Sequence, residues 1–329
     1  MTARVLSGDD VRAALAMKDC IEAMDTVLRE HAAGDLYLPL RSVVRPPKSP
    51  AGFMGLMTAH RAGANPAFGL KAVAIFPENP KRGLDAHQGI VVLFDGEDGR
   101  VTGLLDASAI TAIRTAAVSA VATRALAREG ASTLAVLGAG VQATAHIEAM
   151  ACVLPLERVR IYSRRPEPAA ELAATTAERF AWDVSAAASV EDALREADVV
   201  VTTTTAREPI VDLAWLAPGT HVNAVGSSIP TTRELDGATM AAARIVVDAR
   251  ESALNESGDV LLAMREGALA EDVALAELGE VLIGTEQGRR SPGELTVFVS
   301  LGLAVEDLAA AELALRVAEQ RGLGAEVTL

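Results

Sequence analysis

Apolar and polar positions follow two different spacings in the first third of the chain. Residues 10–33 carry apolar side chains at intervals of three and four, which predicts an amphipathic helix. Between residues 38 and 105 the apolar runs are short and are separated by Gly, Pro and Asn. Such closely spaced runs predict an antiparallel sheet. The expected strands are 41–44, 53–57, 70–75, 89–93 and 101–105, and the Asp-Gly turns at 95–96 and 98–99 lie between the last two.

A third pattern begins after residue 108. The apolar stretch 108–127 predicts a long helix, and from residue 132 strand-like and helix-like segments alternate. The expected strands are 133–137, 158–162, 198–204, 221–225 and 244–247, and the expected helices include 142–152, 167–181 and 190–197. This alternation predicts a doubly wound parallel sheet. A last helix is expected over 301–323, where Gly322 and Gly324 can end it.

These patterns predict an α/β protein in which one domain is inserted into another. We expect a Rossmann-type doubly wound parallel sheet over residues 116–300 that binds a dinucleotide. The flanking segments, 1–115 and 301–329, are expected to form one α+β domain.

Composition and charge narrow the classes of partner. The 329 residues carry a formal net charge of −14, which argues against nucleic acid and anionic membranes as partners. There is no signal-like start and no uninterrupted apolar run of about 18 residues, so we expect a soluble, cytoplasmic protein. The two cysteines, Cys20 and Cys152, lack the spacing of metal ligands, and we expect reduced thiols and no metal site.

A glycine-rich turn follows the expected strand 133–137. In Gly138-x-Gly140-x-x-Ala143, the first glycine permits a tight turn, the second leaves room for phosphates, and the alanine lets the helix pack closely on the strand. Val141 and Gln142 begin that helix, whose free N–H groups favour an anion. The turn predicts a dinucleotide cofactor.

The residues after the second strand of this domain bear on which dinucleotide is bound. NAD-binding domains usually place a carboxylate about 20 residues after the glycines to hold the ribose 2′-hydroxyl. Here Ser163, Arg164 and Arg165 stand in that place, and two guanidinium groups can hold a 2′-phosphate. The alternative is a solvated turn. We therefore expect NADP(H) rather than NAD(H), which stays possible, with Thr203 and Thr204 as further cofactor contacts.

At this point the chain resembles the ornithine cyclodeaminase/mu-crystallin family. The resemblance runs in order over essentially the whole chain. It rests on the residues of 105–117 (Leu-Asp-Ala-Ser-Ala-Ile-Thr-Ala-Ile-Arg-Thr-Ala-Ala), the turn at 138–143, Asn-Ala-Val-Gly at 223–226, Arg-Glu-Leu at 233–235 and Phe-Val-Ser-Leu-Gly at 298–302. The resemblance implies a homodimer joined through the domain that does not bind the nucleotide, and a substrate site between the domains.

The resemblance also implies roles for particular residues. Arg41, Lys71 and Arg114 correspond to the residues that bind the substrate carboxylate, and Arg114 also lies near the cofactor in this family. Independently of the resemblance, a bidentate arginine suits a carboxylate, and a lysine inside the apolar run 68–75 suits a cationic pocket. Without the resemblance, Arg41 and Lys71 could be ordinary surface charges. His87 lies where the family contacts cofactor or substrate, although a lone histidine is often structural.

Two departures from the family pattern bear on the reaction. True ornithine cyclodeaminases carry an aspartate where this chain has Ser228, and a glutamate ahead of Leu56-Met57 that is also missing. A serine hydroxyl cannot act as a carboxylate base near neutral pH. At Ser228 and at Ser163-Arg164-Arg165 the chain resembles the mu-crystallin branch of the family, which reads NADP(H) and reduces cyclic ketimines, more than it resembles true ornithine cyclodeaminases. This resemblance implies an NAD(P)H-dependent ketimine reductase or amino-acid dehydrogenase acting on a small imino or amino acid with a carboxylate. The alternatives are a cyclodeaminase that uses NAD catalytically and a non-catalytic NADP(H)-binding protein.

Three smaller expectations concern neighbouring residues. Met54, Met57 and His60 are expected to line the substrate pocket. Asp106 and Thr111 could cap a helix. The carboxylate-rich segment 256–259 is expected to be solvated and to have no chemical role.

Overall fold

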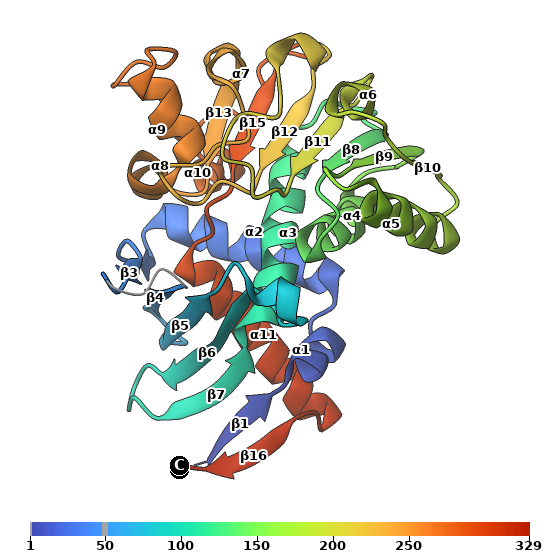
Figure 1. Ribbon diagram of the computed structural model, residues 1–329. Coiled ribbons are helices and arrows are strands. Elements are labelled where there is room, and N and C mark those ends of the chain that lie inside the picture. The colour runs from blue at the N-terminus through green and yellow to red at the C-terminus, as the bar shows by residue number, and fades with distance from the viewer. Residues whose placement is uncertain (1, 48–51) are drawn as a thin grey trace. The chain divides into compact units, whose positions relative to one another are not determined.

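The chain divides into two compact units in the computed structural model, which describes residues 2–47 and 52–329 (Figure 1). Unit 1 takes in the residues up to Arg114 and the segment Gly302–Leu329, and unit 2 is the continuous segment Thr115–Leu301. The first boundary falls within helix α3 (Ala107–Leu126).

Unit 1 contains a mixed sheet. Its eight strands within the described residues are β1 (Thr2–Leu6), β2 (Leu36–Tyr37), β3 (Ser42–Val44), β4 (Phe53–Arg61), β5 (Ala67–Ile75), β6 (His87–Asp95), β7 (Val101–Asp106) and β16 (Ala325–Thr328). Their order is β16-β1-β7-β6-β5-β4-β2, with β3 also paired to β4. The strands from β4 to β7 are antiparallel as expected, while β1 runs parallel to β7. Strands β1 and β16 lie in segments for which we expected no strand.

One face of this sheet packs against helix α11 (Ala304–Arg321). Gly69 and Gly103 make the close approach possible, because a Cβ atom at either position would lie 3.2 Å from a leucine side chain of α11. Since side chains alternate between faces, Lys71 on β5 shares the α11 side with Gly69. The described part of unit 1 is completed by α1 (Gly8–Ala14), α2 (Met17–Ala33) and the short helix η1 (Asn79–Arg82).

The expected single helix over 10–33 is wrong, because two helices form there. A capping box between Ser7 and Asp10 begins α1, which ends at Ala14, and α2 starts at Met17. Helix α2 ends at Gly34, whose φ of 88° lies in the left-handed region. The expected last helix is confirmed in the same way, since Gly322 ends α11 with a φ of 66°. Both cysteines are free, with Cys20 buried and Cys152 exposed.

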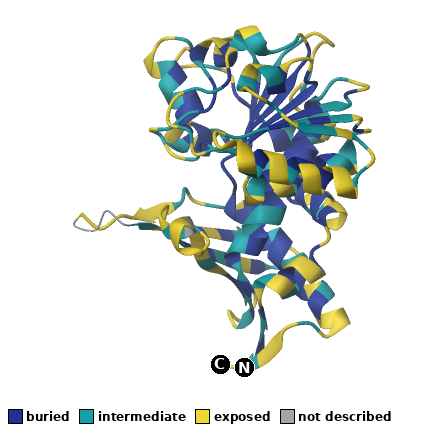
Figure 2. Ribbon diagram, turned by 45° about the vertical axis from the view of Figure 1, so that its right-hand side comes forward, coloured by how far each residue is buried: buried dark blue, intermediate teal, exposed yellow. Residues whose placement is uncertain are grey.

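Unit 2 contains the expected parallel sheet. Its eight strands within the described residues are β8 (Thr133–Leu137), β9 (Arg158–Tyr162), β10 (Asp183–Ala186), β11 (Val199–Thr202), β12 (His221–Ala224), β13 (Arg244–Val247), β14 (Ala276–Glu277) and β15 (Thr296–Val299). They are ordered β10-β9-β8-β11-β12-β15-β13-β14, and every pairing is parallel. The residues of β11, β12 and β15 are buried throughout (Figure 2), as expected for strands covered on both faces.

Helices connect the strands of unit 2. In chain order they are α4 (Val141–Val153), α5 (Pro166–Arg179), α6 (Val190–Leu194), η2 (Leu213–Trp215), α7 (Gly237–Ala242), α8 (Arg250–Glu256), α9 (Gly258–Arg265) and α10 (Leu278–Ile283). The β–α alternation and the reversal of strand order between β8 and β11 define a doubly wound fold.

Helix α3 is mostly apolar and has no polar face, although it carries Arg114 and Arg124. By length and composition it could cross a membrane, but 72% of its most apolar window is buried inside the protein. That burial accounts for its composition, because a helix at the centre of a core has no solvent-facing side to keep polar.

Candidate cofactor and substrate sites

The glycine turn of unit 2 lies where the strand order reverses. Gly138 follows β8 with a φ of 125°, and a Cβ atom there would lie 2.4 Å from the Oγ1 of Thr203, which follows β11. The Gly138 N–H donates to the carbonyl of Tyr162 at the end of β9 (2.8 Å), and the Thr203 N–H donates to the carbonyl of Leu137 (2.8 Å). The ends of three strands are thus held together at the point where doubly wound sheets bind ligands.

Gly140 and the start of α4 are open. Gly140 has φ −100° and ψ −167°, which any residue can adopt, so its conformation alone does not require glycine. A Cβ atom at Gly140 would meet no atom within 4 Å, and no side chain caps the helix. Val141 is 65% exposed, whereas Ala143 is fully buried. A small residue beside open space at an uncapped helix N-terminus fits a pyrophosphate.

The Ser163–Arg165 segment leaves β9 beside this turn. Arg164 and Arg165 are exposed, and within the described part of the chain neither guanidinium forms an ion pair with a carboxylate. Arg165 is the N-cap residue of α5, which continues with Pro166. The two cations therefore stand available to an anionic group near the glycine turn, and no carboxylate occupies the end of β9.

A buried carboxylate that was not among the expected site residues joins two other strand ends. Glu234 accepts hydrogen bonds from the Thr204 N–H (2.7 Å) and hydroxyl (2.6 Å), the Thr202 hydroxyl (2.6 Å) and the Gly226 N–H (2.7 Å). Burial raises the pKa of Glu234, and these hydrogen bonds oppose the rise. The residues that follow β11 and β12 are therefore fixed to each other through one side chain.

Asp259 anchors the same region from α9. Its Oδ1 accepts the N–H groups of Glu234 (2.8 Å) and Leu235 (2.9 Å). Burial raises the pKa of Asp259 to about 7, and the proximity of Glu234 adds to the rise. The expectation that segment 256–259 is solvated is therefore wrong for Asp259, which is 1% exposed. Ser228, half-buried, lies in the loop between Gly226 and Glu234.

In unit 1, two of the expected cations lie in one buried cluster. The Asp307 carboxylate binds Lys71 Nζ at 2.7 Å through Oδ2 and Arg114 Nε at 2.9 Å through Oδ1. Arg114 Nη1 also binds Glu306 at 2.6 Å. All four side chains are at most 4% exposed. The two acidic residues come from the first turn of α11 and were not among the expected site residues.

Arg41 and Thr111 also lie near this cluster. Arg41 Nη2 donates to the carbonyl of Gly302 at 3.1 Å, and a Cβ atom at Gly302 would lie 2.4 Å from Arg114 Nη1. Lys71 Nζ lies 3.5 Å from the Thr111 hydroxyl. Asp106, rather than Thr111, caps α3, since its carboxylate accepts the Ala109 N–H at 2.7 Å. The structure thus brings Arg41, Lys71 and Arg114 toward one end of α11.

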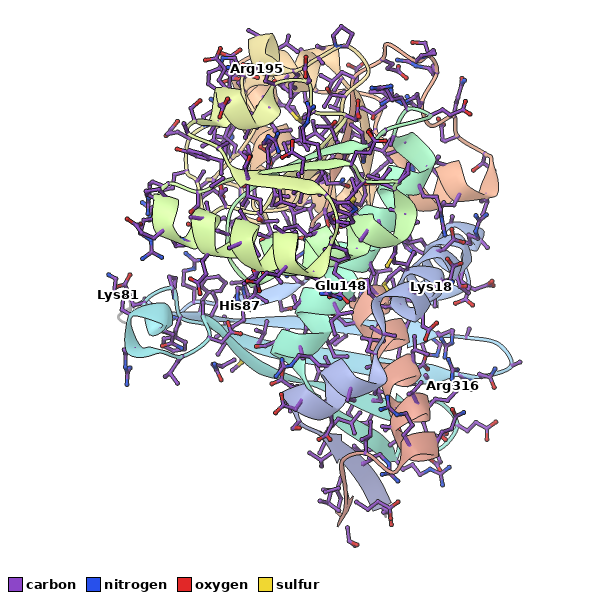
Figure 3. The ribbon with its side chains drawn as sticks, turned by 90° about the vertical axis from the view of Figure 1, so that its right-hand side faces the viewer. Lys18, Lys81, His87, Glu148, Arg195 and Arg316 are labelled. Atoms are coloured by element: carbon purple, nitrogen blue, oxygen red, sulfur yellow. The ribbon has the colours of Figure 1, made fainter. Side chains whose placement is uncertain are left out.

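Other expected residues of unit 1 lie elsewhere. Met57 faces the same side of the sheet as Lys71, its partner in the strand register. Met54 and His60 alternate to the face of the sheet opposite Lys71. His87 stands at the start of β6 (Figure 3). Its pKa is lowered, chiefly by desolvation and further by Lys71, while Asp85 opposes the shift.

Burial also changes the ionisation of Lys71. Desolvation lowers the pKa of Lys71 to about 8, and the cations Arg114 and Arg41 add to the effect. Asp307 opposes it by charge and by a hydrogen bond. The ammonium group is therefore mainly protonated at neutral pH and can release its proton far more readily than an exposed lysine.

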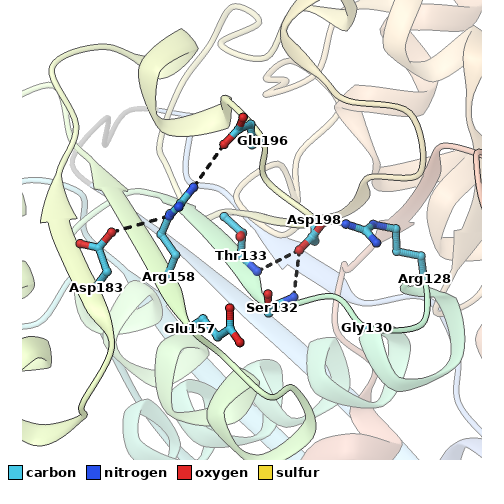
Figure 4. Close-up of a pocket in the computed structure, with 9 residues that line it drawn as sticks. All are labelled: Arg128, Gly130, Ser132, Thr133, Glu157, Arg158, Asp183, Glu196 and Asp198. Carbon is cyan, nitrogen blue, oxygen red and sulfur yellow. Dashed lines mark hydrogen bonds and ion pairs between the residues drawn. The ribbon is translucent and has the colours of Figure 1, made fainter.

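A polar hollow of about 420 Å³ lies at the end of the unit 2 sheet opposite the glycine turn (Figure 4). Its lining includes Thr133, Arg158 and Asp183, each the first residue of a strand, so it lies at the amino ends of the strands. Asp198 accepts the N–H groups of Ser132 (2.9 Å) and Thr133 (3.0 Å) there. Doubly wound sheets bind dinucleotides at the carboxyl ends of their strands, so this hollow is separate from the glycine turn.

Comparison with known proteins identifies the family and the fold of the chain. A family model described as the ornithine cyclodeaminase/mu-crystallin family matches residues 1–320. The chain is 41% identical over 305 residues to the ketimine reductase mu-crystallin of Mus musculus, covering 93% of each protein.

Two solved structures are similar over nearly the whole chain. The Delta(1)-pyrroline-2-carboxylate reductase of Thermococcus litoralis, in complex with NADH and L-proline, matches with a TM-score of 0.94 and 35% identity, covering 98% of this chain and 100% of that one. An archaeal alanine dehydrogenase dimer with bound NAD matches with a TM-score of 0.93 and 32% identity over the full length of both chains.

Proposed function

The chain belongs to the ornithine cyclodeaminase/mu-crystallin family, and we propose that it is an NAD(P)H-dependent reductase of small cyclic imino acids. In this reaction the C=N carbon next to a carboxylate gains a hydride and the nitrogen gains a proton. The observation that carries the proposal is the pair of buried cations, Lys71 and Arg114, in a chain that also has an open dinucleotide turn.

The cations of unit 1 supply binding and a proton. Arg41, Lys71 and Arg114 can hold the substrate carboxylate, with Arg114 offering the bidentate geometry that a carboxylate prefers. Lys71 is also the proton donor that we propose for the imine nitrogen, because its pKa of about 8 keeps it protonated at neutral pH. His87 suits this role less well, since its lowered pKa leaves it mainly neutral there. When bound, NAD(P)H supplies the hydride.

Ser228 bears on the choice between reductase and cyclodeaminase. Its hydroxyl can orient a substrate but cannot take a proton as a carboxylate does near neutral pH. We therefore favour net reduction of an imine over loss of ammonia with ring closure.

The reaction is tested by supplying purified protein with NADPH or NADH and either 1-piperideine-2-carboxylate or 1-pyrroline-2-carboxylate. We expect absorbance at about 340 nm to fall as the reduced nicotinamide is consumed. In a parallel assay, L-ornithine is supplied with NAD. Ammonia release without net cofactor turnover would overturn the reductase in favour of a cyclodeaminase, and tight NADPH binding without either reaction would favour a non-catalytic binding protein.

The proposed cofactor preference is for NADP(H), although the two solved relatives described above are complexes with NADH and NAD. Support comes from Arg164 and Arg165, which are exposed beside the glycine turn where NAD-binding domains carry a carboxylate. We expect Arg164→Asp to weaken NADPH binding about ten-fold or more while NADH binding changes little, because one charge-assisted hydrogen bond contributes about 1.5–3 kcal/mol. Kd values from nicotinamide fluorescence test this, and an unchanged NADPH/NADH ratio would contradict it.

We further propose that the protein is a homodimer joined through unit 1. The face of the sheet that points away from α11 carries exposed apolar side chains, including Met54, Phe68 and Ile90 at 42%, 47% and 46% exposure. Antiparallel sheets usually leave one face polar when it meets solvent, so an apolar face of this kind indicates a covered surface. One solved relative is described as a dimer.

A further inference from the structure

We propose that Asp307 is a positioning residue that keeps Lys71 protonated and fixes its distance from Arg114. The inference rests on the proposed function insofar as Lys71 is the proton donor. The structural part of the inference, a carboxylate that controls the charge of Lys71, can be tested without any reaction.

The contacts of Asp307 place one carboxylate between two cations. Its Oδ1 accepts from Arg114 Nε at 2.9 Å, and its Oδ2 lies 2.7 Å from Lys71 Nζ. Because the two oxygens of a carboxylate are held rigidly, the two bonds fix how far Lys71 Nζ can lie from the guanidinium group. A substrate carboxylate that binds both cations depends on this spacing.

The two acidic neighbours on α11 have different partners. Glu306 is ion-paired with Arg114 at 2.6 Å. Among the described residues, the ion pair of Lys71 is with Asp307. Glu306 therefore pairs with Arg114, while Asp307 is the residue that pairs with Lys71. Substitutions at the two positions should change the pKa of Lys71 by different amounts.

Because two arginines act on Lys71, its protonation depends mainly on Asp307. Arg114 on α3 and Arg41 repel its ammonium, and His87 on β6 is close enough to respond to the lysine charge. Glu306 adds a negative charge beside Arg114, and Asp307 is the carboxylate in direct contact with Lys71. Without Asp307, desolvation and two arginines would act on Lys71 with no bonded anion, and its neutral form would dominate at physiological pH.

The pKa of Lys71 can be measured directly by NMR, because the whole chain has only four lysines, Lys18, Lys48, Lys71 and Lys81. Lys18 and Lys81 are exposed. In protein labelled with ¹³C at lysine Cε, the Lys71 signal can be assigned by its loss in Lys71→Met. A pH titration of that signal then reports the pKa of Lys71 in the cofactor-free protein.

We expect a midpoint near 8 in the unmodified protein and a midpoint lower by about one unit or more in Asp307→Asn, that is, at least a ten-fold loss of proton affinity. The matched control is Glu306→Gln, which removes a carboxylate of the same cluster that is ion-paired with Arg114 and should shift the midpoint by less than half as much. A midpoint in Asp307→Asn that stays with the unmodified protein, or one that Glu306→Gln shifts equally, would overturn the proposal.

The kinetic consequence has its own sign. If Lys71 must be protonated, kcat/KM is highest below the pKa of Lys71 and falls as pH rises through about 8. Asp307→Asn should therefore move this alkaline limb of the pH profile to lower pH. Glu306→Gln should raise KM and leave the limb near its original place. If the unmodified protein reduces no imine, the proposed function fails, whereas the NMR titration still decides the part played by Asp307.

A second variant covers the case in which Asp307→Asn does not fold. Asp307→Glu keeps the charge but changes the reach of the carboxylate, so the Lys71 midpoint should stay within about half a unit while KM for the imino acid rises about ten-fold. An Asp307→Glu protein with an unchanged KM would show that the spacing of the two cations is unimportant, and would overturn the positioning role.

Discussion

A buried guanidinium group is costly to desolvate, and Arg114 offsets that cost with the carboxylates of Glu306 and Asp307. Arg41 differs, because it is partly exposed and donates to the carbonyl of Gly302. Two arginines proposed for the same substrate group therefore differ in how much the fold depends on them.

This difference predicts separate effects on stability and binding. We expect Arg114→Ala to lower the free energy of unfolding by about 3–5 kcal/mol, because it leaves buried carboxylates without their partner. Arg41→Ala should change the free energy of unfolding by less than about 1 kcal/mol and raise KM for the imino acid about ten-fold. Urea denaturation and steady-state kinetics measure the two effects, and equal destabilisation by both substitutions would contradict the argument.

At the scale of elements, the two glycines of the turn between β8 and α4 serve different purposes, one in the backbone conformation and one in ligand binding. Gly138 has a positive φ and leaves no room for a Cβ atom beside Thr203, whereas Gly140 has an ordinary conformation and faces open space. The fold needs a glycine at the first position, and we infer that the ligand needs one at the second.

Alanine substitutions distinguish the two glycines. Gly138→Ala should destabilise the protein by about 1–3 kcal/mol through backbone strain and the clash with Thr203. Gly140→Ala should leave thermal stability unchanged but weaken NADPH binding about ten-fold, because the methyl group would occupy space proposed for the pyrophosphate. Thermal melts and fluorescence titrations of both variants provide the measurement. Unimpaired NADPH binding in a folded Gly140→Ala protein would argue against the assigned phosphate position.

Most elements could be predicted from local patterns, and the exceptions have physical reasons. The parallel sheet and the glycine turn depend on periodicity and on residues close in the chain. The break between α1 and α2 falls at Leu15-Ala16, where no glycine or proline signals it. Strand β1 pairs with β7 and with β16, both distant from it in the sequence, so its partners could not be found locally.

The candidate site could be predicted only in part. Arg41, Lys71 and Arg114 followed from the family resemblance, but Asp307 lies 193 residues from Arg114 and nothing near either residue indicates the pairing. One signal was present, since Glu306-Asp307 interrupts an apolar run in the sequence, where a carboxylate needs a partner. Glu234 was missed because acidic residues in polar segments are usually exposed, and its burial depends on donors from two separate strand ends.

At the scale of the molecule, the proposed dimer depends on the apolar face of the unit 1 sheet. Phe68 is 47% exposed on β5, beside His60 at a ring-centroid distance of 4.4 Å. We expect Phe68→Glu to convert the dimer to monomers, because pairing two copies would bury a carboxylate in each. Light scattering measures the mass, and Phe68→Leu serves as the apolar control. A Phe68→Glu protein of unchanged mass would place the interface elsewhere.

The discontinuity of unit 1 has a consequence for the order in which the protein is made. Unit 2 is continuous, whereas unit 1 needs α11 and β16, which follow unit 2 along the chain and are therefore synthesised after it. Until then Lys71 and Arg114 have no Asp307 beside them, and one face of the antiparallel sheet has no helix to cover it. We therefore expect unit 2 to fold first in a nascent chain, while the N-terminal segment of unit 1 keeps both faces of its sheet exposed, and open to chaperones, until α11 and β16 have been synthesised.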